Sequence, residues 1–236
     1  MTTPRYAIVP ASFTEPKPVS FTVTNSTIAK VLVEPLQAAA AVAEQPPFQG
    51  GSTLLDMTAS SSDAAAKDVI LYLGRILTTQ SVGATGNITL TAQNVLTRAT
   101  AGYLTDGWVV GDPVMLFTPF GTAQVAAGID GILGIVTAVT NTVLTVNGTP
   151  FAAGTNVLTA GTRLVNVGQL FRTTIAANAG NASATPNVPL LGNANDNAVI
   201  KTELKLSSTT MLIAAMQAAV AALPAVVSIT PRLARY

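Results

Sequence analysis

The sequence predicts an all-β protein, with a β-sandwich body of jelly-roll-like layout and a small inserted β-barrel domain. Short stretches rich in Val, Ile, Thr and Leu recur along the chain, and Gly, Asn, Pro and Ser separate them as turns separate strands. The chain also combines 49% hydrophobic with only 10% charged residues, the reverse of a disordered composition. Its 236 residues suffice for one large β domain or two small ones.

The first third of the chain contains three expected strands. Residues 20–24 alternate polar and apolar side chains, as a strand with one buried face does. Residues 52–58 and 68–74 are expected to form a strand pair joined by the polar turn 59–67. The strand 68–74 is apolar on both faces, so we expect it to be covered on both sides. The Pro- and Gly-containing segment 45–51 breaks any regular structure before this pair.

The middle of the chain has more closely spaced turns. Residues 107–117 predict a turn followed by a strand, and residues 132–140 and 143–146 predict two strands with Asn-Thr between them. Asn147-Gly148 is typical of a tight type I′ turn. These hairpins predict a small barrel of its own over residues 95–165.

The last part of the chain returns to widely spaced strands. They are expected at residues 169–176, 187–191, 201–206 and 225–230. Residues 209–222 are ambiguous, because Ala and Met favour a helix while the β-rich neighbours favour a strand and turn; we expect the strand. Residues 1–94 plus 166–236 would therefore form the sandwich body around the inserted domain 95–165.

The composition excludes several kinds of site. With no Cys and no His, the chain has no disulfide, no zinc site of the usual ligands, no thiol nucleophile and no imidazole base. The net charge is +1, the basic residues are scattered and aromatic residues make up 5%, so we expect no specific nucleic-acid partner. The apolar segment 211–229 is interrupted by polar residues and Pro, and we expect a buried core segment without a membrane role.

Some residues could carry chemistry, and each has a structural alternative that we favour. Gly128, Gly131 and Gly134 lack the spacing of a dinucleotide fingerprint and are interpreted as turn or strand-edge glycines. An Asn-rich segment could offer oxygen ligands to calcium, but it has one carboxylate and is interpreted as a turn. The residues of that segment are Asn193, Asn195, Asp196 and Asn197.

The remaining candidates are a carboxylate pair, a Ser–Lys arrangement and an aromatic group. Asp63 and Asp68 could form an acid/base pair, but both flank the predicted turn, where Asp commonly caps backbone N–H groups. Lys205 lies near Ser207 and Ser208 without a third orienting group, so we expect an exposed strand residue. The aromatic group is interpreted as the core of the inserted barrel, with a contact patch for a neighbouring subunit as the alternative. Its members are Trp108, Phe117, Phe120 and Phe151.

Two stretches resemble proteins of tailed-phage virions. Residues 52–79 resemble the strand-turn-strand of capsid decoration or cement proteins, with Asp63 in the turn and the strand 68–73 ending in Leu-Tyr-Leu. The segment 203–236 is similar to their C-terminal strands. Residues 107–146 resemble a tail-tube pattern, carried by Gly-Asp before an apolar strand and by Ile-Val-Thr-Ala-Val-Thr.

This resemblance implies a structural subunit of a tailed-phage virion, and first of all a capsid decoration protein that stabilises the head lattice. The alternatives are a tail-tube subunit around the DNA channel and a β-rich receptor- or carbohydrate-binding module. The expected partners are copies of the chain and other virion proteins, the major capsid protein among them, with synthesis in the host bacterial cytoplasm. No catalytic residue, cofactor or metal is expected. A weakly charged surface also suits a protein that packs against copies of itself.

Overall fold

All regular elements in the described part of the chain are β-strands, as the alternating sequence pattern predicts. The computed structural model describes residues 12–14, 18–23, 29–33, 52–77, 88–117, 134–148, 163–181, 186–191, 204–207, 209–220 and 224–235. The fifteen strands of these residues form two antiparallel sheets. The all-β fold class is therefore confirmed.

The smaller sheet has six strands and is built around the antiparallel pair β4 (Ser52–Ser61) and β15 (Val226–Arg235). Two short strands follow one another along the free side of β15, and two more pair with the free side of β4. They are β1 (Ser12–Thr14), β2 (Val19–Thr22), β12 (Val188–Leu191) and β13 (Leu204–Leu206).

The larger sheet has nine strands and extends beyond the sandwich. Its order is β3-β14-β5-β11-β8-β9-β10-β7-β6. The first four are β3 (Lys30–Val33), β14 (Thr210–Met216), β5 (Lys67–Arg75) and β11 (Arg163–Ile175). The others are β8 (Pro113–Phe117), β9 (Gly134–Val139), β10 (Val143–Val146), β7 (Val95–Arg98) and β6 (Ile88–Ala92).

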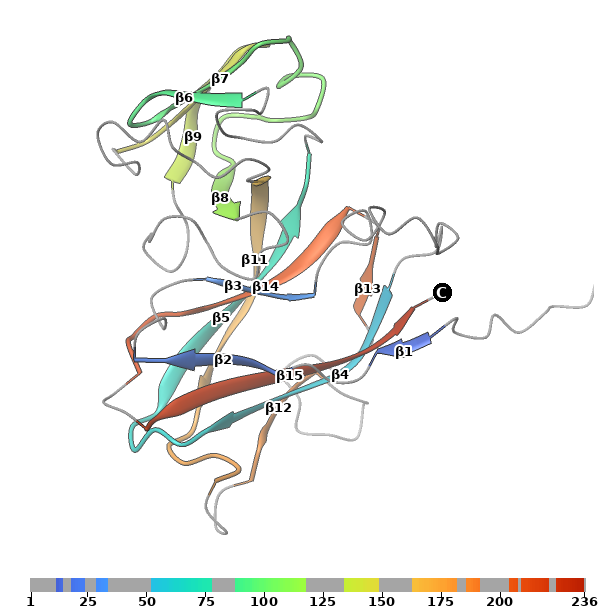
Figure 1. Cartoon of the computed structure of the whole chain (residues 1–236), viewed down its shortest axis with the longest axis vertical. Helices are drawn as coiled ribbons and strands as arrows, with labels where there is room; N and C mark the ends of the chain where they lie inside the picture. Colours follow the sequence, from blue (N-terminus) through green and yellow to red (C-terminus); the bar gives the residue numbers. More distant parts are fainter. Residues whose placement is uncertain are drawn as a thin grey trace, which may run out of the picture.

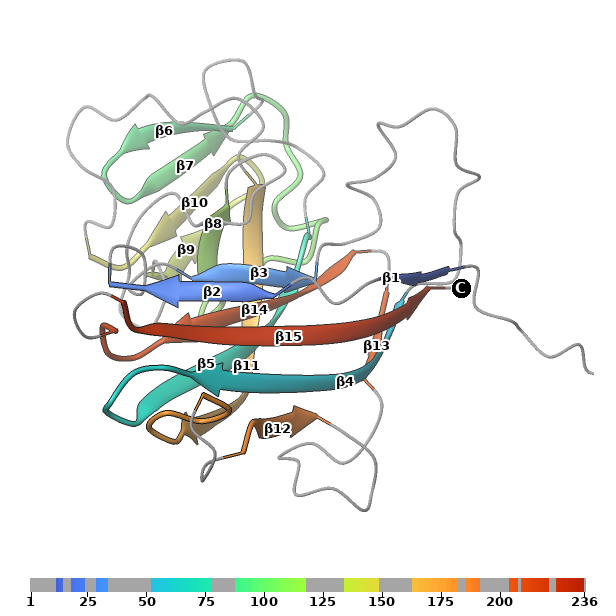
Figure 2. The same cartoon turned by 60° about the horizontal axis from the view of Figure 1, so that its bottom comes forward.

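The two sheets form a sandwich body from which one end of the larger sheet projects. In Figure 1 the strands β2, β15, β4 and β12 lie across the lower half, and β5 and β11 run upward past them. Strands β6 to β10 form the upper part of the molecule, called here the lobe (residues 88–117 and 134–148). Figure 2 shows the two layers of the body from another side, with β15 and β4 in front of β14, β5 and β11.

Strands β4 and β5 occupy the predicted positions but do not pair with each other. β4 pairs with β15, whereas β5 pairs with β11 and β14 in the other sheet. The expected strand pair is therefore wrong as a hairpin. The turn between β4 and β5 crosses from one sheet to the other. It is bonded to β15, because the backbone N of Ser62 donates to the carbonyl of Val226 at 2.8 Å.

The prediction that β5 is covered on both sides is confirmed. Val69 and Leu71 belong to the cluster of buried side chains between the two sheets. Ile70 and Tyr72, which point to the opposite face, belong to a second buried cluster. A central strand with apolar side chains on both faces is therefore placed where both faces are buried.

Strand β14 resolves the ambiguity of residues 209–222. Leu212, Ala214 and Met216 lie in the cluster between the sheets, and the alternate residues lie in the second cluster. This period of two is that of a strand, and β14 has partners on both sides, β3 and β5. The strand expectation is confirmed for Thr210–Met216, because burial between two neighbours outweighs the helix preference of Ala and Met.

Strand β15 is longer than predicted and includes Pro231, a residue that central strands usually exclude. β2 pairs with residues 226–229 of β15, and β1 pairs with residues 233–235. Pro231 is opposite neither of these two short strands, and on the other side of β15 it is opposite Met57 of β4.

The lobe has a buried cluster of its own. It contains Trp108 and Leu144 of the predicted domain 95–165, Ile88 and Leu90, which precede that range, and Leu164 of β11 near its end. The sheet of the lobe does not close on itself among the described strands, since its order ends at β6. A closed barrel is therefore not observed there, and the division into two domains stays a prediction.

The hairpin predictions in the lobe are confirmed except for one turn type. β9 and β10 pair antiparallel around Asn141-Thr142 as expected. Gly148 has a φ of 69°, but Asn147 is not among the residues with positive φ, which a type I′ turn requires at both positions. Asn147 instead bonds to β9: its Oδ1 accepts from the backbone N of Ile135 at 2.7 Å, and its own N donates to the Ile135 carbonyl at 2.9 Å.

Candidate functional site

Two tight turns in the lobe lead from β7 to β8 and expose apolar side chains. The first closes between Tyr103 and Trp108, where the Trp108 N–H donates to the Tyr103 carbonyl at 3.1 Å. The second closes at Asp112, whose Oδ2 accepts from the Val109 N–H at 2.9 Å. Glycines permit both turns, since Gly107 and Gly111 have φ of 95° and 99°, values that side chains disfavour.

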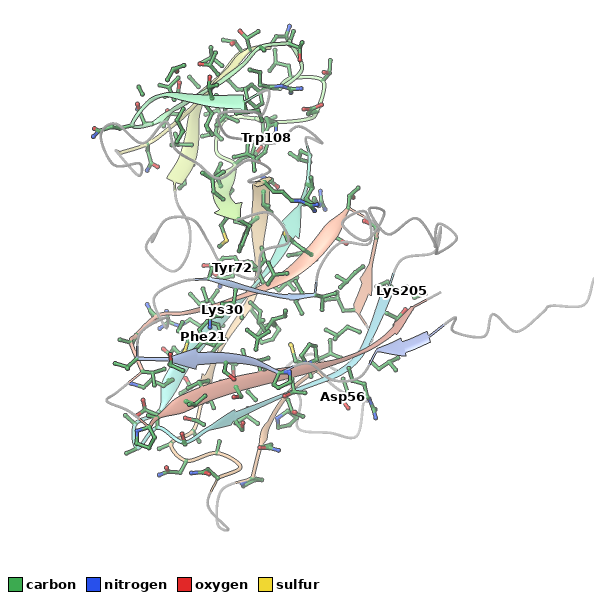
Figure 3. All side chains as sticks on the ribbon, in the orientation of Figure 1. Phe21, Lys30, Asp56, Tyr72, Trp108 and Lys205 are labelled. Atoms are coloured by element: carbon green, nitrogen blue, oxygen red, sulfur yellow. The ribbon has the colours of Figure 1, made fainter. Side chains whose placement is uncertain are left out.

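The second turn is fixed to the neighbouring strand β9. The Gly111 N–H donates to the Val136 carbonyl at 2.8 Å, and the Val136 N–H donates to the Asp112 carbonyl at 2.9 Å. Trp108, only 1% exposed, anchors the same segment in the core of the lobe (Figure 3). The second turn is therefore fixed by its bonds to β9 and by the buried Trp108 that precedes it.

Four large apolar side chains around these turns are exposed to solvent. Val109 is 57% and Val110 62% exposed at the second turn, Leu104 is 50% exposed at the first, and Ile135 is 42% exposed on β9. Exposed apolar residues that lie together mark an interaction site. Val109 and Val110 are consecutive, and the bonds of Gly111 and Asp112 to Val136 place their turn beside the strand of Ile135. We call Leu104, Val109, Val110 and Ile135 the apolar tip.

A partly buried ion pair connects the first turn to β7. Nη1 of Arg98 lies 2.6 Å from Oδ2 of Asp106, and its guanidinium lies over the ring of Tyr103, 4.9 Å from the centroid. Gly102 makes room for this group, because a Cβ there would lie 2.7 Å from Nη2 of Arg98. Burial raises the pKa of Tyr103 well above its ordinary value, so this phenol stays neutral.

The outward face of the lobe sheet is neutral and rich in Thr and Val. The hydroxyls of Thr91 and Thr97 lie 2.9 Å apart, and the Thr137 hydroxyl donates to the carbonyl of Thr145 at 3.3 Å. The charged side chains among the described residues of the lobe are Arg98 and Asp106, which pair with each other, and Asp112, which accepts a backbone N–H and keeps its negative charge. The lobe therefore offers hydroxyls and apolar groups to a partner.

The predicted carboxylate pair consists of two separately bound groups. Asp63 is completely buried in the β4–β5 turn, and its Oδ1 accepts from the Ala65 N–H at 2.9 Å, so the capping interpretation is confirmed. Its Oδ2 lies 3.4 Å from Nζ of Lys67, which also donates to the Ala219 carbonyl at 2.8 Å. This buried pair joins the turn to the segment after β14.

Asp68, in contrast, lies on the surface of β5 and bonds across the sheet to β11. Its Oδ1 accepts from the Thr174 hydroxyl at 2.6 Å, and its Oδ2 lies 2.5 Å from Nη2 of Arg172. These two contacts, that of Thr174 first, hold the pKa of Asp68 below its ordinary value. Asp68 is therefore ionised at neutral pH and acts as a cross-strand link.

The other candidates are dispersed. Lys205 is an exposed residue of β13 as expected, and the Ser207 hydroxyl beside it bonds to Thr209 and Thr210. Gly134 starts β9, where a Cβ would lie 3.1 Å from Asn147 Oδ1, so it fits a close approach of strands. Gly128, Gly131, Ser208 and the Asn-rich segment 193–197 lie outside the described residues.

The aromatic group is divided between two cores. Trp108 lies in the cluster of the lobe, whereas Phe117 lies in the second cluster of the body, on the face of the larger sheet turned away from the smaller one. Core packing is confirmed for both, but a common cluster is wrong for this pair. Phe120 and Phe151 lie outside the described residues.

Sequence reasoning missed the apolar tip, although a signal was present. Two adjacent valines, Val109 and Val110, lie between Gly107 and the Gly111-Asp112 turn, where polar residues are usual. The sequence pattern predicts a turn and then a strand over residues 107–117 and assigns the two valines to neither. Only the hydrogen bonds to Val136 show that the turn carries these side chains outward.

The described residues contain no group of three or more metal-ligating side chains, and no helix among them could cross a membrane. Compared with family models, curated proteins and solved structures, the chain shows no match to any of them.

Proposed function

We propose that this protein is a structural subunit of a tailed-phage virion, and specifically a capsid decoration protein that stabilises the head lattice. The observation that carries the proposal is the apolar tip, a rigid and exposed apolar surface on a lobe that projects from a sandwich body. A projecting contact surface is what a subunit needs to reach a neighbour. The resemblance of residues 52–79 and 203–236 to decoration proteins supplies the virion context.

In this proposal the sandwich is a jelly-roll-like body that sits on the shell, and residues 95–165 form an inserted domain that reaches neighbouring subunits. The separate buried cluster of the lobe supports such a division. Stabilisation is mechanical: each contact buries apolar surface worth roughly 25 cal/mol per Å², and many copies add up over a shell. Two resolved transitions in calorimetry of the whole chain would support the division, and a single one would count against it.

The alternative, a tail-tube subunit, is favoured by one contact. The two parts of the tube-like pattern, Gly111-Asp112 and the strand from Ile135, are hydrogen-bonded to each other through Val136. They therefore form one structural unit, as a shared pattern would require. A carbohydrate-binding module is less well supported, because Trp108, the single Trp of the chain, is buried and offers no stacking surface.

Deletion of the gene from the phage separates these functions. Loss of a decoration protein leaves tailed particles whose heads break under heat or osmotic shock, and added purified protein restores their resistance. Tailless particles with normally robust heads would replace the proposal with the tube function. Particles of unchanged form and strength would overturn both. Electron microscopy and DNA release on heating provide the measurements.

A further inference from the structure

We infer that Asn147 is a site of spontaneous chemical modification, and that the fold of the lobe controls the rate of the reaction. Asn147-Gly148 is the one Asn-Gly pair of the whole sequence. The backbone N of the residue after an asparagine can attack the side-chain carboxamide, and a glycine hinders this attack least because it has no Cβ. The reaction needs no enzyme and no partner, so it is independent of the proposed function.

Water is the single co-reactant of this modification, which replaces an amide by a carboxylate. The Gly148 nitrogen forms a bond to Cγ of Asn147, and the carboxamide nitrogen leaves as ammonia with the proton of the Gly148 N–H. The resulting cyclic imide then adds water at one of its two carbonyls. Opening at the side-chain carbonyl gives aspartate, and opening at the main-chain carbonyl gives isoaspartate. Asn147 and Gly148 are both exposed, so water reaches the site.

Two hydrogen bonds hold Asn147 against β9 while the lobe is folded. Its Oδ1 accepts from the backbone N of Ile135 at 2.7 Å, and its own backbone N donates to the Ile135 carbonyl at 2.9 Å. The oxygen is also packed closely against Gly134, where an added Cβ would lie 3.1 Å from it. Cγ of Asn147 has to turn toward the Gly148 nitrogen to react. The bond between Oδ1 and Ile135 restrains that rotation.

Neighbouring bonds keep this end of the strand pair closed. The Val146 N–H donates to the Asn94 carbonyl at 2.9 Å, and the Val136 N–H donates to the Asp112 carbonyl at 2.9 Å. Both β10 and β9 are therefore bonded to further segments beside the Asn147 contact. Asn147 becomes free to react only when this end of the lobe opens locally, so the rate of modification follows the population of the open form.

The two products affect the lobe differently. Aspartate keeps an acceptor oxygen for the N–H of Ile135. Isoaspartate places the carbon that carries Oδ1 in the main chain, so the bond to Ile135 and the present course of the chain at Gly148, with its φ of 69°, cannot both be retained. A lobe that has opened and formed isoaspartate does not close again in its original form. The reaction thus makes a reversible local opening permanent.

Incubation of the purified full chain at mildly alkaline pH, folded or unfolded in guanidinium chloride, tests the inference. Peptide mapping by mass spectrometry measures aspartate and isoaspartate at residue 147. The reaction should be at least about fivefold slower in the folded protein, the factor that one net hydrogen bond provides. Ile135→Pro removes the N–H that holds Oδ1 and should raise the folded rate toward the unfolded one. The matched control, Ile135→Val, keeps this N–H and should react like the wild type.

Circular dichroism melts establish that the variants are folded, and the comparison of folded with unfolded wild type decides the matter if Ile135→Pro does not fold. No product at residue 147 in the unfolded chain would overturn the site itself. Equal rates in the folded and unfolded wild type would overturn control by the fold. Equal rates in folded Ile135→Pro and Ile135→Val would show that the bond from Ile135 to Oδ1 is not the restraint.

Discussion

The buried ion pair of Asp63 and Lys67 should be one of the most sensitive points of the sandwich body. Asp63 is fully buried and the Lys67 side chain is 10% exposed, with 3.4 Å between Oδ2 and Nζ. Replacing Asp63 with Ala leaves the mostly buried Lys67 ammonium without its counter-charge, with the Ala219 carbonyl as a remaining acceptor, and it also removes the cap on the Ala65 N–H.

The expected cost follows from this geometry. Removing one partner of a buried pair destabilises a protein by about 3–5 kcal/mol, because the other charge stays buried without compensation. At about 2–4 °C per kcal/mol for a chain of this size, Asp63→Ala should lower Tm by roughly 6–20 °C. Asp63→Asn keeps an acceptor for the Ala65 N–H and should cost about 1 kcal/mol less.

Urea unfolding followed by circular dichroism measures these differences. The matched control is Asp68→Ala five residues along the chain, which breaks a largely exposed ion pair and should cost at most about 1 kcal/mol. In the double variant Asp63→Ala/Lys67→Met both charges are gone, so most of the lost stability should return. Equal costs at Asp63 and Asp68, or additive effects in the double variant, would refute the role assigned to the buried pair.

Three further predictions concern single sites. Tyr103→Phe should leave stability unchanged or raise it by up to about 1 kcal/mol, because the Tyr103 hydroxyl is buried without a hydrogen-bond partner. Tyr72→Phe is the control, at an equally buried tyrosine whose hydroxyl is not among the unpaired groups; it should not stabilise the protein, and calorimetry of both variants measures the difference. Gly74→Ala should lower the free energy of unfolding by about 1–3 kcal/mol, since the added Cβ would lie 2.7–2.8 Å from three core side chains. Gly168→Ala, whose Cβ would have nothing within 4 Å, should leave that free energy unchanged when both variants are unfolded in urea. The lowered pKa of Asp68 means that its stabilising contribution is present above the unfolded-state pKa and is lost as the pH falls through the folded-state pKa. Wild type and Asp68→Asn should therefore differ in urea stability at neutral pH, and the difference should shrink as the pH falls below the ordinary pKa of an aspartate; a difference that does not change with pH would contradict this.

The position of most strands could be predicted from the sequence, because alternation is a local property. β2, β5, β9, β10 and the start of β15 lie where the pattern of apolar residues indicates them. The burial of both faces of β5 was readable as well, since polar residues are missing from both of its sides. The absence of Cys and His likewise excluded whole classes of site without any structure.

The candidate surface was less accessible to sequence reasoning. Val109 and Val110 have the composition of a buried strand, and their exposure depends on backbone bonds to Val136, a residue more than twenty positions away. The lobe core has the same character. Trp108 shares its cluster with Leu116 of β8, whereas the next residue, Phe117, lies in the other cluster because β8 turns its alternate residues to different faces.

The sequence by itself predicted that the chain is all-β and where most of its strands lie, although it indicated no strand at β1, β3, β6 or β7. The tertiary structure alone decided that β4 and β5 belong to different sheets, that β15 completes the sheet of β4 from the far end of the chain, and that the tip is left uncovered. The physical reason is that side-chain alternation acts between neighbours in sequence. Sheet partners and exposure depend on contacts between distant segments, and a strand with two apolar faces is equally compatible with several partners until all of them are packed.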